Sequence, residues 1–161
     1  MPYSEPYSTL LEGIATRLRD ASGPFAQSDQ VRLWVDEALD EVAPSNELQQ
    51  ELARSVPIAL VCDAGATVVD DDSDADIEAQ DVRVWFAAHG PTIEAMVTGD
   101  GDEYWGACAL RHWVFTRLSD RAWSLSGWES LRLVDIRPVA VRGVGRAIWR
   151  ATLTTRRPQE V

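Results

Sequence analysis

Apolar residues near the start of the chain recur with the period of an α-helix. They form a narrow stripe at Leu11, Ile14, Ala15 and Leu18. Thr9 and Glu12 are spaced as a capping box, so they predict where this helix begins. The Ser-Gly-Pro sequence at 22–24 predicts where it ends, because glycine and proline interrupt helices.

The pattern over residues 31–42 is ambiguous. Its apolar positions fit a helical period, while Val31, Leu33 and Val35 also alternate as they would in a strand. The local pattern slightly favours the helix. A short helix is then predicted from Pro44 to about Arg54.

The remaining segments alternate between strand and helix patterns. Residues 56–62 form a continuous apolar run typical of a buried strand, and residues 82–86 alternate as a second strand. A helix is predicted over about 102–118. A final hairpin pairs 131–141 with 146–155 around two turn glycines, and Pro138 predicts an edge position or a bulge in its first strand.

This order of elements predicts an α+β fold. We expect a mostly antiparallel sheet of about four strands packed against two or three helices. The 161 residues suit a single domain, 1–161, with an acidic loop at about 64–80 and a C-terminal β-hairpin at about 131–156. No apolar run approaches the roughly 20 residues that span a bilayer, so we expect no membrane association.

Charge is distributed unevenly along the chain. Residues 1–110 hold 22 acidic residues against 5 arginines, while residues 111–161 hold 10 arginines against 4 acidic residues. Every cation is an arginine, which forms bidentate carboxylate contacts better than lysine does. Acidic and basic parts of this kind pair between neighbouring copies, pair within the monomer, or simply face water; the sequence leaves all three open.

The one dense cluster of carboxylates consists of Asp70, Asp71, Asp72 and Asp74, followed by further acidic residues to 81. Its spacing partly matches a calcium-binding loop, but Ala75 stands where glycine is needed and Asp81 where glutamate is needed. We therefore interpret it as a solvated acidic connection between two strands, and predict no metal site.

Few residues suggest catalysis. His89 and His112 lack a serine or cysteine nucleophile in a strained elbow motif nearby, so we predict no catalytic residue and no cofactor. Cys62 and Cys108 lack metal-ligand spacing and are predicted to be buried, reduced thiols. Cys108 and His112 are four apart on the predicted helix, which indicates a core thiol beside a half-buried imidazole.

The last third of the chain is rich in tryptophan and arginine, the residue types that most often anchor protein interfaces. Its hairpin carries the arginines Arg132, Arg137, Arg142, Arg146, Arg150, Arg156 and Arg157. Alternation places several of these on one face of a sheet, which suits contact with carboxylate or phosphate groups. Trp128 follows a glycine in a polar connection, where it either contacts a partner or completes the core between helix and sheet.

From residue 56 onward the chain resembles the tail terminator (tail completion) proteins of Mu-type contractile-tailed phages and related prophages. The resemblance rests on the order of a proline-led strand at 56–61, an alternating strand at 82–86, a Gly-x-x-Tyr-led helix at 101–118, a Leu-x-Gly-Trp-x-x-Leu-x-Leu connection at 125–133, and an Arg-Pro hairpin. It favours a strand at 31–35. Residues 20–55 and 70–81 depart from the family pattern.

The resemblance implies a structural protein of the virion, made in the host cytoplasm and placed at the tail–neck junction. Such proteins form a homohexameric ring that caps the tail tube, ends tail polymerisation and offers a head-joining surface. Implied partners are the tail tube protein, the tail sheath protein, the head-side neck or connector protein, and DNA passing through the lumen without sequence-specific contact. The same part occurs in headless phage-derived particles.

The interface residues that we predict fall in two groups, one basic and one acidic. They are Trp128, Arg132, Arg137, Arg142 and Arg146, and Asp70, Asp71, Asp72 and Asp74. Two rival functions remain: another neck, minor tail or non-phage protein-binding module, and a small hydrolase or metal-dependent enzyme using His89, His112 and the acidic cluster.

Overall fold

One mixed sheet organises the part of the chain that the computed structural model describes, residues 5–35, 46–53, 57–69, 77–99, 105–120, 123–139 and 147–158. Its five strands are β1 (Val31–Val35), β2 (Ile58–Val69), β3 (Ile77–Ala88), β4 (Arg132–Val139) and β5 (Ala147–Pro158). They lie in the order β1-β2-β3-β5-β4, with β1 parallel to β2 and every other pair antiparallel. The predicted α+β class is confirmed.

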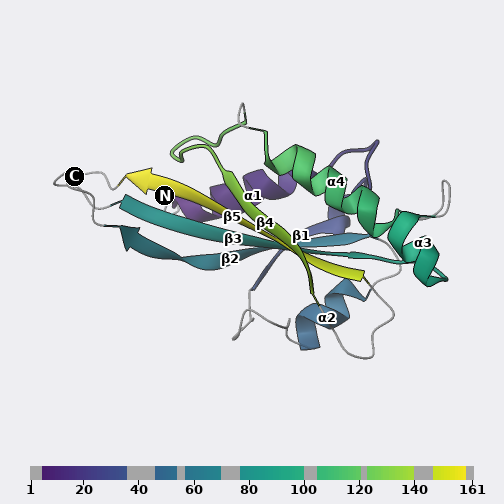
Figure 1. Ribbon diagram of the computed structural model, residues 1–161. Coiled ribbons are helices and arrows are strands. Elements are labelled where there is room, and N and C mark those ends of the chain that lie inside the picture. The colour runs from purple at the N-terminus through teal and green to yellow at the C-terminus, as the bar shows by residue number, and fades with distance from the viewer. Residues whose placement is uncertain are drawn as a thin grey trace.

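Helices cover the two faces of the sheet unequally. The long helices α1 (Pro6–Leu18) and α4 (Ala107–Leu118) lie on one face, and the short helix α2 (Asn46–Leu52) lies on the other (Figure 1). A further short helix, α3 (Ile93–Thr98), precedes α4 and was not predicted. The Thr92 hydroxyl caps α3 by accepting a hydrogen bond from the Ala95 N–H at 3.1 Å.

The first helix begins one turn earlier than predicted. Glu5, not Thr9, is its N-cap: the Glu5 carboxylate accepts hydrogen bonds from the Tyr7 and Ser8 amides at 2.7 and 3.0 Å. Pro6 follows at the first helical position, where its missing N–H costs nothing. The predicted capping box at Thr9 and Glu12 is therefore wrong, because both residues lie inside the helix.

The ambiguous segment contains a strand, β1, as the alternating pattern and the family resemblance indicated. Residues 36–42 lie outside the described residues. β2 and β3 run for 12 residues each and extend into the predicted acidic loop. Only 70–76, rather than 64–80, connects them, and this whole connection lies outside the described residues.

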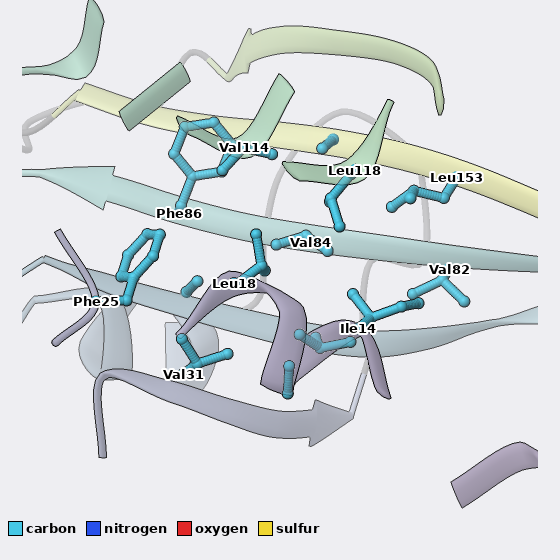
Figure 2. Close-up of a cluster of buried hydrophobic side chains, with 14 of the residues drawn as sticks. Ile14, Leu18, Phe25, Val31, Val82, Val84, Phe86, Val114, Leu118 and Leu153 are labelled. Carbon is cyan, nitrogen blue, oxygen red and sulfur yellow. The ribbon is translucent and has the colours of Figure 1, made fainter. Parts of the chain in front are cut away.

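The core has one cluster on each side of the sheet. On the α1/α4 side, Ile14, Leu18 and Leu118 pack against alternate residues of β3 such as Val84 and Phe86 (Figure 2). On the α2 side, Leu48 and Leu52 pack against a second set of strand residues. That second set is Ile58, Leu60, Cys62, Trp85, Ala87 and Ile148.

The C-terminal hairpin is present as predicted, and β4 is an outer strand of the sheet. Pro138 lies in it, in agreement with the expected edge position. The glycine turn of the hairpin lies outside the described residues. The helix predicted over about 102–118 begins later, at Ala107, because Gly106 is its extended N-cap.

Candidate interaction surface

The face of the sheet that carries α2 is covered by that helix at one end only (Figure 1). Residues paired directly across antiparallel strands project from the same face, so the register shows which side chains accompany Trp85 and Ile148 there. Three rows run across β3, β5 and β4 on this face: Trp85, Arg150 and Arg137; Arg83, Thr152 and Asp135; Asp81, Thr154 and Arg132. Arg156, paired with Ala79, extends the series.

We call this set of side chains the arginine face. Its arginines are Arg83, Arg132, Arg137, Arg150 and Arg156. Arg132, Arg137 and Arg156 are exposed, and the other two are half-buried. The face also holds two carboxylates, Asp81 and Asp135, so its five arginines give it a formal net charge of +3 among the described residues.

Two contacts orient guanidinium groups within the arginine face. The Arg150 guanidinium lies 5.7 Å from the ring centroid of the fully buried Trp85. This cation–π contact helps to hold the guanidinium in place. Arg137 Nε lies 3.2 Å from Asp135 Oδ2. The Arg137 side chain remains 70% exposed, so this ion pair adds little stability and leaves most of the guanidinium available to a partner.

Only part of the predicted interface can be placed. Arg132 and Arg137 both lie on the arginine face. They are five residues apart, so strict alternation would place them on opposite faces; the register shift between Leu133 and Asp135 brings both to one face. Arg142 and Arg146, and the acidic residues Asp70, Asp71, Asp72 and Asp74, lie outside the described residues.

Arg83 on β3 was missed by sequence reasoning, because its place beside the hairpin arginines depends on the pairing of β3 with β5. Arg157 was grouped with the hairpin arginines but projects from the opposite face, where its guanidinium lies 5.9 Å from the ring of Trp128.

Trp128 belongs to the core. Its side chain is 7% exposed, its ring meets that of Tyr7 edge-on at 6.0 Å, and its indole N–H donates to the Pro6 carbonyl at 3.4 Å. The alternative that Trp128 completes the helix–sheet core therefore describes the monomer, and its indole offers a partner little surface.

Tyr7 also contacts a buried carboxylate at this end of α1. Its hydroxyl donates to Glu78 Oε2 at 2.9 Å, and Glu78 is 8% exposed. This hydrogen bond to Glu78 raises the pKa of Tyr7, because the carboxylate favours the protonated phenol. The contact ties the first turn of α1 to β3, so its role is structural.

The residues considered for catalysis are dispersed among different environments. Cys62 is buried, but Cys108 is exposed on α4 beside exposed His112, so the predicted core thiol and half-buried imidazole are wrong. His89 is half-buried just after β3. Within the described ranges, no group of three histidine, cysteine or acidic side chains is placed to hold a metal ion.

No helix in the same ranges is long and apolar enough to cross a membrane.

Comparison of the chain with models of known protein families and with curated protein sequences found no match.

Proposed function

We propose that this chain is a structural tail terminator, a protein that assembles as a ring on the end of a contractile-type tail tube and stops its growth. The observation that carries the proposal is the arginine face. It is a broad surface built on three paired strands, and its cations stand in cross-strand rows.

The shape and chemistry of this face suit a large partner. Guanidinium groups form forked hydrogen bonds to carboxylates and are weakly hydrated, so they favour extended contact with an acidic protein surface. A small-molecule site is instead a concave, mostly apolar pocket with a few convergent polar groups. The arginine face consists of outward-projecting charges, which supports an assembly role over the hydrolase alternative.

The order of sequence motifs supplies the rest of the proposal. The proline-led strand, the alternating strand, the helix before the Gly-Trp connection and the hairpin correspond to β2, β3, α4 and β4–β5. In this proposal the ring contacts the tail tube, the sheath and the head-side connector. The arginine face meets the acidic surface of one of these proteins or the phosphates of passing DNA.

The test uses particles made from the genome that encodes this chain, with its gene deleted and variants supplied in trans. We expect Arg132→Glu combined with Arg137→Glu to leave the monomer folded, because both side chains are exposed at the outer strand. Tail lengths measured by electron microscopy should become broad, because reversed charges repel an acidic partner surface.

Two controls define the result. Arg132→Lys with Arg137→Lys keeps the charge and should retain much of the function. Glu12→Arg changes an exposed charge on α1, away from the arginine face, and should leave tail length normal. Normal tails in the charge-reversed variant would show that this face is not the working surface, and normal tails in the deletion itself would show that the chain is not a terminator.

A further inference from the structure

The sheet has two outer strands, β1 and β4, and apolar side chains are exposed at both. On β1, Leu33 and Val35 are 40% and 68% exposed; on β4, Val134 is 57% exposed. An outer strand that exposes apolar residues is a template for pairing with another strand. Charged residues, proline and bulges usually protect such edges, and β4 has Asp135, Pro138 and a register shift beside Val134. The three apolar side chains are nevertheless exposed.

A groove runs along β4 on the side of the sheet that carries α4. Phe115 of α4, itself 53% exposed, lines three adjoining clefts there. The largest has a volume of about 600 Å³ and also contacts Leu131, Arg132 and Leu133. Another is lined by Arg111, Val134 and Ile136. The groove thus presents apolar side chains together with Ser119, Ser130 and Asp135, beside a strand with no outer neighbour among the described residues.

Strand directions determine how a second copy would continue the sheet. β1, β2 and β5 run in one direction, and β3 and β4 run in the opposite direction. If a neighbour is placed beside β4 with its helices on the same side, its β1 meets β4 in antiparallel orientation. Antiparallel pairs are the more common and slightly more stable arrangement.

The side chains match in this arrangement. Leu33 is paired with Val61, a core residue of the α1/α4 side, so Leu33 and Val35 project toward that side. A neighbour's β1 laid against β4 brings these two residues to the groove beside Phe115. The apolar surface exposed at one end of the sheet then fills the groove at the other.

The charged residues also differ between the β4 edge and the β1 edge. Arg111, Arg132 and Arg137 surround the β4 edge, with Asp135 as the carboxylate between them. At the β1 end, Asp29 and Glu47 are exposed, Glu51 pairs with Arg32 at 2.6 Å, and the Arg19 guanidinium donates to the Val31 carbonyl. Three carboxylates therefore stand against two arginines there. Opposite charge at the two ends favours joining an end to its opposite and disfavours joining like ends.

We propose that the partner of the β4 groove is the β1 strand of a second copy of this chain, added antiparallel so that one sheet continues from copy to copy. Such a head-to-tail contact generates a ring where the rotation closes and a filament where it does not. The inference rests on the proposed function for ring closure, while the contact itself is testable on the purified chain.

The test blocks each end separately. Val35→Lys blocks the β1 edge and Val134→Lys blocks the β4 edge, because each buries an unpaired cation in the apolar contact. Both introduced charges are positive, so the two blocked edges also repel each other in a mixture. Each variant alone should raise the concentration needed for self-association, measured by light scattering, by at least about tenfold. An equimolar mixture should form dimers and nothing larger, because the intact β4 of one variant meets the intact β1 of the other.

Ile93→Lys is the matched control, since Ile93 is 76% exposed on α3 and outside both edges; it should associate like the wild type. If Val35→Lys fails to fold by circular dichroism, Leu33→Lys replaces it, and if Val134→Lys fails to fold, Phe115→Lys replaces it. A wild-type chain that stays monomeric up to about 1 mM overturns the pairing. So does an edge variant that associates alone at the same concentration as the wild type, because its contact then does not use the blocked edge.

The same variants separate this inference from the proposed function. Normal tails with the edge variants and irregular tails with the Arg132/Arg137 reversal would retain the terminator and reject the edge pairing. Dimers from the mixture together with normal tails in a gene deletion would retain the pairing and reject the terminator.

Discussion

Gly106 links α3 to α4, and replacing it with alanine should destabilise the protein through a backbone clash. Gly106 is the N-cap of α4, with φ −76° and ψ 165°, a conformation that any residue adopts. A Cβ at this position would lie 2.6 Å from both the Thr98 carbonyl carbon and the Val97 carbonyl oxygen, and would also meet the Gly99 nitrogen. All three atoms belong to the end of α3.

The cost follows from the rigidity of those atoms. A flexible side chain can move aside, but backbone atoms at the end of a helix move only with the helix. Overpacking of this kind typically costs about 1–3 kcal/mol, and alanine is a poorer N-cap than glycine. We expect Gly106→Ala to lower the free energy of unfolding by about 2–4 kcal/mol. For a domain of this size that lowers Tm by roughly 5–15 °C.

Urea unfolding of Gly106→Ala, Gly106→Ser and Gly127→Ala tests the reasoning. Serine restores a good N-cap acceptor but keeps the Cβ, so a steric cost makes it about as harmful as alanine. Gly127 has φ +84° and open space around its Cβ position, so alanine there costs only the left-handed conformation, about 1–2 kcal/mol. If Gly106→Ser is as stable as the wild type, the clash is refuted and capping explains the glycine.

Two further predictions concern polar contacts of α1 and the loop after it. Tyr7→Phe removes the hydrogen-bond donor to buried Glu78 and should cost about 1.5–3 kcal/mol by urea unfolding; adding Glu78→Gln should recover part of that loss, because the buried charge is gone. Hydrogen bonds from Ser22, followed by Arg117, lower the pKa of Asp20 below its ordinary value of 3.8. The ionised Asp20 carboxylate therefore contributes its full stability to the folded protein above about pH 4, and this contribution is lost as pH falls through the folded pKa. Asp20→Asn should therefore flatten the decline in stability below about pH 4, and a decline as steep as in the wild type would contradict this.

The elements of the fold were predictable where burial is periodic in the sequence. Ile14 and Leu18 are buried in α1 as the stripe indicated, and the alternating strand at 82–86 lies within β3. The segment at 31–42 was harder, because its apolar spacing fits two periods. What selects the strand is parallel pairing of Val31–Val35 with residues 59–63, a contact across 28 positions that no local pattern contains.

The candidate surface was predictable only in part, for a related reason. The sequence pattern grouped Arg132 with Arg137 on one hairpin, but alternation alone would place them on opposite faces, and only the register shift between Leu133 and Asp135 brings them to the same one. Arg83 joins them through the register of β3 on β5, and Trp128 is buried because Tyr7 and Pro6 of α1 meet it from the far end of the chain. Local sequence gives the chemistry of a side chain, but pairing between distant strands decides which neighbours it acts with.

If copies pair at their edges and cap a tail tube, the arginine faces of all copies lie on one side of the joined sheets. A neighbour that pairs at the edge lies in the plane of the sheet and does not cover the arginine face. Every copy then presents its arginine face on the same side, opposite α1 and α4. Each copy contributes a formal +3 from the described residues, so joining copies produces a row of basic patches separated by the β1, β2 and α2 part of each copy. A row of this kind binds acidic surfaces or phosphates more strongly than a monomer does, because its contacts form together once the copies are joined. Binding to a polyanion should therefore weaken in the edge variants even though their arginines are unchanged, which connects assembly at the edges to recognition on the face.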